Sequence, residues 1–305
     1  MKESMSRREI FSRTLGLTAF VAGGAIMPNS VYSQGKILRN SGTKIKLSLN
    51  AYSFNGPLRA GEMTLGDVVD YCANHGFGGL DATGYYFPGY PDVPNDGYLY
   101  GLKKRAFLNG ITINGTGVKN DFSVPDSERR KQDVQMVKNW IEVAEKLGAS
   151  VIRIFSGLKR PDGYSFDQVL KWMVLDIKEC VEHGRKHGVI VGLQNHNDFA
   201  KTADETIEIV NAVNSEWFGV ILDVGSLRQG DPYQEIEKLL PYAVSWQLKE
   251  KVWYGKREAA VNLEKIKAIL EKGGYRGFLP IETLGKGDPK IKVKDFMADV
   301  REYFG

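Results

Sequence analysis

The chain has 305 residues, 42% of them hydrophobic and 26% charged, which is the composition of an ordinary globular protein and excludes a disordered or collagen-like chain. The 41 basic and 37 acidic residues give a net charge of +4, of which residues 1–33 carry half (4 basic against 2 acidic residues), so the rest of the chain is nearly neutral and gives no reason to expect nucleic acid as a partner. Two cysteines, Cys72 and Cys180, exclude a disulfide framework and a cysteine-rich zinc site.

Residues 1–34 have the pattern of an export signal. Arg7 and Arg8 precede an apolar run over residues 15–27, and the pair resembles the twin-arginine signal that exports folded proteins. An ordinary signal sequence, or a tail with a chance arginine pair, is the alternative. The apolar run is shorter than the ~20 residues that span a bilayer as a helix, so no stable membrane anchor is expected. We predict a periplasmic or otherwise exported protein, with a linker over residues 35–43.

From residue 44 onward, short apolar runs alternate with amphipathic ones. Eight runs are predicted as strands buried on both faces: Ile45–Ala51, Gly79–Thr83, Ile111–Thr116, Val151–Phe155, Val189–Gln194, Val220–Val224, Val244–Leu248 and Phe278–Glu282. The clearest helical patterns lie between or after them: Asp126–Leu147, Phe166–His187, Ala203–Val213, Tyr233–Leu240, Leu263–Lys272 and Val293–Phe304. This repeat predicts a single (β/α)8 TIM barrel over residues 44–305. A doubly wound open sheet is the alternative, but no glycine-rich phosphate turn follows the first strand.

Polar residues end four consecutive predicted strands. They are Gln194, Asp223, Gln247 and Glu282. Because unpaired polar groups are costly to bury, these residues have no packing reason to be there. In a barrel they converge on one pocket near the axis, where all four offer oxygen ligands to a hard divalent cation.

The segments around these positions resemble one family. Gly192–His196 (GLQNH), Leu222–Ser226 (LDVGS), Trp246–Glu250 (WQLKE) and Gly277–Glu282 (GFLPIE) are similar to motifs of the xylose-isomerase-like sugar phosphate isomerase/epimerase barrels. The resemblance covers roughly residues 44 to 303. It implies a TIM barrel that holds one divalent metal with a Glu, an Asp, a His and a Glu, and that isomerises or epimerises sugars or dehydrates related polyols.

Two of the four implied ligands differ in this chain. Asp223 and Glu282 match the family's Asp and second Glu, whereas Gln194 stands in place of the first Glu and Gln247 in place of the His. Without the imidazole, a retained metal is expected to be Mg²⁺, Mn²⁺ or Ca²⁺ rather than Zn²⁺. The alternative is a metal-free pocket in which the two amides hydrogen-bond sugar hydroxyls.

Three further polar residues are candidates for the same pocket. His196 is a candidate proton carrier or a structural brace of its loop. If strand alternation holds, Lys249 shares a face with Gln247 and acts as base or as electrostatic clamp, with a plain salt bridge as the alternative. Arg153 is expected to contact the substrate or to pair with a carboxylate.

Aromatic residues near the strand ends favour a sugar ligand, because aromatic faces stack on the apolar faces of sugar rings. Tyr85, in the loop after the second strand, and Trp246, with Trp253, are candidates for such stacking, and packing within the protein is the alternative. His183, His187 and both cysteines fall on predicted outer helices, where we expect exposed histidines and free thiols without a catalytic role.

These features together predict an exported carbohydrate isomerase, epimerase or keto-sugar lyase. Its chemistry would be proton abstraction next to a carbonyl, with Glu282, Lys249 and His196 as catalytic groups and a divalent metal that assists them. A barrel that only binds a sugar, without metal or catalysis, is the alternative. An apurinic endonuclease is poorly supported, since such enzymes need many histidines and nucleic acid is not an expected partner.

Overall fold

The computed structural model describes residues 32–33, 35–39 and 42–305. The predicted export signal therefore lies outside the described residues, apart from Tyr32–Ser33, which form strand β1 and pair in antiparallel fashion with β2 (Lys36–Ile37). Within the predicted linker, Arg39 donates a hydrogen bond to the carbonyl of Ala243, 2.6 Å away. This part of residues 35–43 therefore contacts the folded domain rather than hanging free of it.

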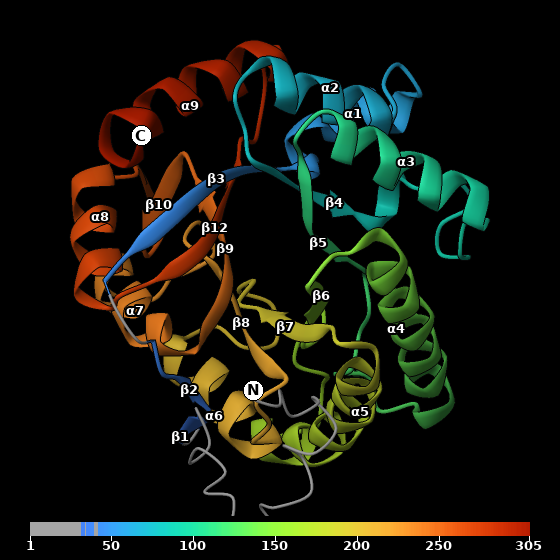
Figure 1. Ribbon diagram of the computed structural model, residues 1–305. Coiled ribbons are helices and arrows are strands. Elements are labelled where there is room, and N and C mark those ends of the chain that lie inside the picture. Colours follow the sequence, from blue (N-terminus) through green and yellow to red (C-terminus); the bar gives the residue numbers. More distant parts are fainter. Residues whose placement is uncertain (1–31, 34, 40–41) are drawn as a thin grey trace, which may run out of the picture. The chain divides into compact units, whose positions relative to one another are not determined.

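Eight parallel strands close into a barrel (Figure 1), which confirms the predicted fold. The strands are β3 (Lys44–Asn50), β4 (Gly79–Thr83), β5 (Thr112–Gly117), β6 (Val151–Phe155), β7 (Ile190–Gln194), β8 (Phe218–Asp223), β9 (Ala243–Lys249) and β12 (Arg276–Glu282). Their order around the barrel is the chain order, and β12 closes it by pairing with both β3 and β9. Six of these strands are buried along their whole length, or all but one residue of it, as their apolar composition requires.

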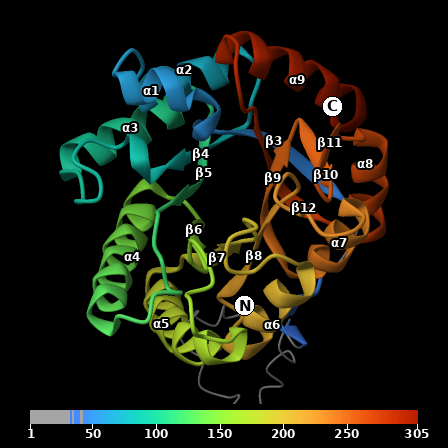
Figure 2. The ribbon, with the colours of Figure 1, turned by 180° about the vertical axis from the view of Figure 1, so that it is seen from behind.

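Helices surround the strands in a ring, which Figure 2 shows from behind. They are α2 (Leu65–Asn74), α3 (Asp96–Leu108), α4 (Ser127–Leu147), α5 (Phe166–His187), α6 (Ala203–Val213), α7 (Pro232–Leu239), α8 (Leu263–Lys272) and α9 (Pro289–Phe304), with a short α1 (Asn55–Ala60) after β3. Side chains cap the longest two at their N-termini: Asp126 on α4 and Ser165 on α5. Both end at a glycine in the left-handed conformation, Gly148 at φ 77° and Gly188 at φ 67°.

Several elements were not predicted, among them the short helix α1. Helix α3 has glycines at positions 97 and 101 and a mixed polar face, so no amphipathic pattern marks it. A hairpin of β10 (Lys251–Tyr254) and β11 (Arg257–Ala260) follows β9 directly and lies outside the barrel sheet. Within the described residues, no helix is long and apolar enough to cross a membrane.

Candidate functional site

The carboxyl ends of the barrel strands surround a cavity of about 420 Å³. Seven of the nine predicted site residues line it: Tyr85, Arg153, Gln194, His196, Gln247, Lys249 and Glu282. Asp223 lies behind this wall and is fully buried. The position of the cavity is the one that the barrel fold dictates for a functional site.

The four polar residues that were predicted to converge form one hydrogen-bonded group together with Lys249. The amide nitrogen of Gln194 donates to Oε1 of Gln247 and to Oδ2 of Asp223, both at 2.7 Å. The Lys249 ammonium donates to the same Oδ2 of Asp223 at 2.8 Å. It also lies 3.3 Å from Oε1 of Glu282. The strand ends therefore bring two carboxylates, two amides and one ammonium into mutual contact.

The opposite charges within this hydrogen-bonded group stabilise one another. Burial alone would raise the pKa of Asp223, but Lys249, together with His196 and Ser226, outweighs burial and the pKa is lowered. Burial would likewise lower the pKa of Lys249, but the charges of Asp223 and Glu282 hold it above its usual value. The pKa of Glu282 is raised, because burial outweighs the attraction of Lys249. The raised pKa keeps Lys249 in its ammonium form at neutral pH, which favours the role of electrostatic clamp over that of base.

Side-chain contacts also fix the backbone at this end of the barrel. Asn195 donates from Nδ2 to the carbonyl of Asp223 at 2.8 Å, and its Oδ1 accepts from the amide of Asp223 at 2.9 Å. Gly225 leaves room for the lysine, since a Cβ at this position would lie 2.6 Å from Cδ of Lys249. Asn195 and Gly225, one from each of two sequence motifs, thus position Asp223 and Lys249.

The arrangement does not fit the divalent ion that the family resemblance implies. Oδ2 of Asp223 accepts three hydrogen bonds, from Gln194, Lys249 and Ser226, and its Oδ1 accepts one from the amide of Gly225. Gln194 presents its NH₂ group, not its oxygen, to Asp223 and Gln247. An ion-binding site needs free oxygen lone pairs pointing at a common centre. Here that centre is filled by donors.

Arg153 links this hydrogen-bonded group to the aromatic side of the cavity. Its guanidinium donates to the Tyr85 hydroxyl at 2.7 Å and to Oε1 of Gln194 at 3.3 Å. It also lies over the ring of Phe155, 4.3 Å from the centroid. Arg153 thus points inward as predicted, but it pairs with neither Asp81 nor Asp223 through a hydrogen bond.

His196 stands where this cavity meets a second one of about 270 Å³. Its Nδ1 lies 2.7 Å from Oδ2 of Asp198, which leaves Nε2 free of that partner. His196, Lys249, Glu282 and Leu284 line both cavities. The wall of the second cavity carries Trp253, from the β10–β11 hairpin.

The prediction that Trp246 contacts the substrate is wrong. The residue is fully buried and packs edge-on against Tyr275, with ring centroids 5.7 Å apart. Side chains alternate along a strand, so Gln247 and Lys249 point into the barrel while Trp246 points toward the helices. Trp253, in contrast, does reach a cavity wall.

Sequence reasoning missed several cavity residues that lie outside the strand ends: Tyr52, Arg59, Lys119, Leu158, Asp198 and Leu284. They come from loops and from short helices that no periodic pattern marks. Asp198 had one usable signal, because it follows His196 by two residues and a carboxylate there can orient the ring.

Asp81 is a buried carboxyl close to the cavity. Asn50 donates to it from Nδ2 at 3.2 Å. Burial raises its pKa to about 6, with Arg153 opposing the rise and Glu282 adding to it.

The substitution Asp81→Asn tests this shift. Between its unfolded pKa of 3.8 and its folded pKa of about 6, the folded state binds the proton more tightly, so stability falls as pH rises. Asparagine has no such proton. We therefore expect D81N to gain free energy of unfolding relative to wild type between about pH 4.5 and 7.5, by about 2 kcal/mol in urea titrations. Asp67→Asn, at a carboxyl whose pKa is lowered below 3.8, should lose free energy of unfolding relative to wild type as pH rises through the acid range below about pH 4, and should show no such trend above it. Equal pH trends for the two variants would contradict the shift.

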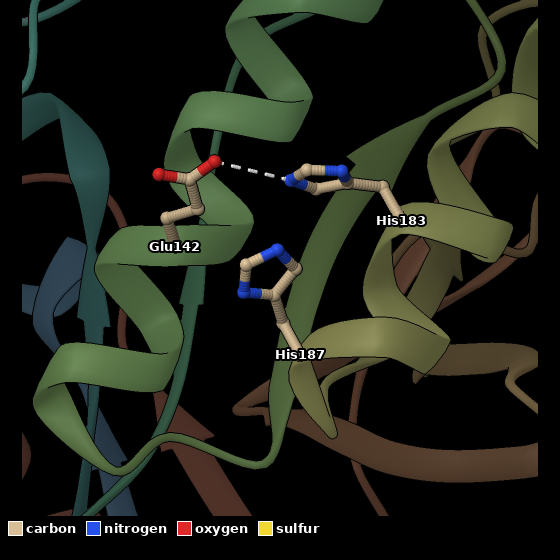
Figure 3. Close-up of side chains that lie close together, drawn as sticks. All are labelled: Glu142, His183 and His187. Atoms are coloured by element: carbon tan, nitrogen blue, oxygen red, sulfur yellow. Dashed lines mark hydrogen bonds and ion pairs between the residues drawn. The ribbon is translucent and has the colours of Figure 1, made fainter.

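A second group of metal-type donors lies between two outer helices (Figure 3). Within the described part of the chain, Glu142 on α4 and His183 and His187 on α5 place one ligand atom each within 4.8 Å of one another. The histidine side chains are 22% and 26% exposed, so they are more buried than predicted. Cys72 and Cys180 are free thiols as predicted, and both are buried.

Residues 69–299 match the family described as xylose isomerase-like TIM barrel. No functionally curated protein matches the chain. Among solved structures, it is similar to a D-psicose 3-epimerase with D-tagatose from Clostridium cellulolyticum H10 (TM-score 0.70, 18% identity, 85% of this chain and 99% of that chain). It is also similar to a 3-keto-D-glucoside 4-epimerase from E. coli (TM-score 0.68, 13% identity, 85% and 100%). A third is the IolI protein with a bound zinc atom (TM-score 0.70, 17% identity, 85% and 99%).

At these identities the structural likenesses concern the fold. Within the described residues, the histidine–glutamate group between α4 and α5 suggests a metal for this protein, without fixing which one. The family match is stronger, because it spans more than half of the chain. The protein belongs to the xylose isomerase-like TIM barrel family.

Proposed function

We propose that the protein is an exported enzyme that removes a proton from the carbon next to the carbonyl group of a keto-sugar, and that it acts as a lyase on a keto-glycoside. The observation that carries the proposal is the Glu282 carboxylate in the cavity wall with the Lys249 ammonium 3.3 Å away. A base and a cation side by side are what the formation of an enolate requires. The sugar-modifying relatives of the same fold support the substrate class, and the signal-like residues 1–34 support export.

The first step uses Glu282 and Lys249. Glu282 takes the proton, the C–H electron pair forms a carbon–carbon double bond, and the carbonyl pair moves onto oxygen. Lys249 has three N–H donors, of which Asp223 and Glu282 engage two, and it lines the cavity. The third is available to the enolate oxygen, whose negative charge it stabilises.

The second step uses His196. The enolate pair re-forms the carbonyl, the double bond shifts to the next carbon, and the carbon–oxygen bond there breaks. The glycosidic oxygen leaves with the electron pair of that bond and takes a proton from Nε2 of His196, whose Nδ1 faces Asp198. The products are the free alcohol and an unsaturated keto-sugar, so no other reactant is consumed.

Gln194 favours elimination over epimerisation. Epimerisation needs a second proton carrier on the other face of the substrate, and the family motif has a glutamate at this position. An amide cannot take that proton. Glu282 as base and His196 at the junction of the cavities remain, and removing one proton while donating another to a leaving oxygen is what elimination needs.

The two adjoining cavities support a substrate of two units. The cavity of about 420 Å³ would hold the keto-sugar, and the one of about 270 Å³ would hold the leaving group beside Trp253. The guanidinium of Arg228 lies 4.4 Å from the centroid of the Trp253 ring and fixes its orientation.

Trp253→Ala is expected to raise KM for a keto-disaccharide by roughly 2- to 10-fold, the loss of one stacking contact, with kcat unchanged. The matched substrate is the methyl keto-glycoside, whose small leaving group does not reach the indole and whose KM should not change. An equal rise in KM with both substrates would show that Trp253 does not contact the leaving group.

The proposed function is tested on free sugars and on their 3-keto glycosides, with chromatographic detection of the products. Release of the alcohol from the keto-glycoside is expected. Formation of a stereoisomer or a positional isomer instead would show an epimerase or isomerase. Saturable sugar binding without any product would show a binding protein and overturn the proposal.

A further inference from the structure

We infer that the Lys249 ammonium takes the place of the divalent cation in this barrel, so that the cavity works without a bound metal ion. The inference rests on the proposed function for its catalytic meaning, whereas its structural content rests on the contacts of five side chains. The first observation is the place of the ammonium. It bridges Asp223 and Glu282, the two carboxylates that match the family's ligands, at 2.8 and 3.3 Å.

A metal ion on the same carboxylates would lie next to this ammonium. Divalent cations sit ~2.0–2.6 Å from their oxygen ligands, so the two positive charges would be only a few ångströms apart in a buried site. Lys249 has 10% of its side chain exposed and Asp223 none, so solvent screens such a repulsion little. The carboxylate pair therefore holds either the ammonium or the ion.

The two glutamines, through the orientation of the Gln194 amide, favour the ammonium over the divalent ion. A lysine stands at the same point of the family motif, so the lysine alone is not the difference. Gln194 replaces a carboxylate and directs its NH₂ group at Asp223 and Gln247, both at 2.7 Å. To ligate an ion it would have to turn its oxygen inward, and both hydrogen bonds would be lost. Arg153, which donates to the Gln194 oxygen at 3.3 Å, favours the observed orientation.

A Mn²⁺ titration followed by electron paramagnetic resonance tests the inference on the full-length protein. The background is His183→Ala/His187→Ala, which removes the histidines between α4 and α5 and leaves the cavity untouched. We expect no stoichiometric Mn²⁺ binding at millimolar ion, and turnover of a keto-glycoside that EDTA does not change. Stoichiometric binding that disappears on Glu282→Gln, or turnover that EDTA abolishes and Mn²⁺ restores, would overturn the inference. Absence of turnover under all conditions would instead count against the proposed function, and the titration would still decide the metal.

Restoring the family ligands provides a matched comparison. Gln194→Glu/Gln247→His is made once with Lys249 kept and once with Lys249→Ala, and circular dichroism checks that both fold. If the ammonium occupies the ion's place, Mn²⁺ should bind more tightly to the variant without the lysine. Equal affinities would mean that Lys249 does not compete with the ion.

A different observation, independent of the cavity, carries a second inference. The geometry points to a site for a late transition ion such as Zn²⁺ between α4 and α5, formed by Glu142, His183 and His187 (Figure 3). The histidines are four residues apart, one turn of α5, and their ring centroids are 4.4 Å apart. Glu142 reaches across from α4, with Oε1 3.3 Å from Nε2 of His183. Two imidazoles and one carboxylate are a ligand set that zinc prefers.

A fourth residue orients one of the imidazoles. Oε2 of Glu145 lies 2.8 Å from Nδ1 of His187, which leaves Nε2 of that ring for the ion. A carboxylate behind a ligating histidine is the usual support of a metal site. The ion would tie α4 to α5 on the outside of the barrel.

Zinc calorimetry and thermal unfolding test this site. Wild type is expected to bind one Zn²⁺ and to gain several degrees in Tm, since the ion binds the folded state. His187→Ala should lose both effects and Glu145→Gln should weaken binding by about 10- to 100-fold. Lys186→Ala, on the same helix turn, is the control and should behave as wild type. Zinc binding that survives the double change His183→Ala/His187→Ala, or no binding by wild type, would overturn the site.

Discussion

Glu282→Gln is expected to lower kcat for a keto-glycoside by about 10²- to 10⁴-fold while the substrate still binds. Glutamine keeps the size of the side chain and a hydrogen-bond acceptor for Lys249, but it cannot take a proton. Because burial raises the pKa of Glu282, the acid limb of the wild-type pH–rate profile should lie above the usual glutamate value, and activity should rise as the carboxyl ionises. Steady-state kinetics and equilibrium binding separate the two effects.

Cys180→Ala is the control for this prediction, because the thiol is buried on α5, away from the cavity. It should leave kcat near the wild-type value. If E282Q retained full turnover, another group would be the base and the reaction steps given for Glu282 would be wrong.

Lys249→Met is expected to cost about 3–5 kcal/mol of unfolding free energy at neutral pH, because it leaves Asp223 and Glu282 buried without their cation. Asp223 has a lowered pKa, so its share of the stability is present above the usual aspartate value and is lost as pH falls through the folded pKa. The difference in unfolding free energy between variant and wild type should therefore decrease at acidic pH. Urea unfolding at a series of pH values measures it.

Lys251→Met is the matched control for that substitution. Lys251 is two residues further along the chain and pairs with Glu258, but its side chain is 56% exposed. Exposed pairs contribute only about 0–1 kcal/mol. If the two variants lost the same free energy, burial of the Asp223–Lys249–Glu282 group would not be what makes it important.

The barrel could be predicted because its signals are local. Apolar runs mark strands, and the helices Phe166–His187, Ala203–Val213 and Leu263–Lys272 have the bounds that their amphipathic patterns indicate. Helix α3 and the β10–β11 hairpin were missed because the first has no apolar stripe and the second is short and partly exposed. The hairpin matters for function, since it carries Trp253.

The site could be predicted only as a set of strand-end residues. Strand alternation places Gln247 and Lys249 in the cavity, and the same rule excludes Trp246, whose assignment to the substrate came from its residue type alone. The amide orientation of Gln194 and its hydrogen bonds to two other strands are tertiary facts that no pattern along the chain reveals. They change the interpretation of the site, because an amide that donates inward is not a metal ligand.

Solvent exchange at the reacting carbon tests directly whether Glu282 and Lys249 form an enolate. A 3-keto glycoside is incubated in D₂O with EDTA-treated protein, and the recovered substrate and the keto-sugar product are examined by NMR and mass spectrometry. We expect deuterium at the carbon next to the carbonyl in substrate recovered from wild type, together with release of the alcohol, and neither with Glu282→Gln. Bound substrate that keeps its proton in wild type and releases no alcohol would contradict it, because Glu282 and Lys249 would then not form the enolate.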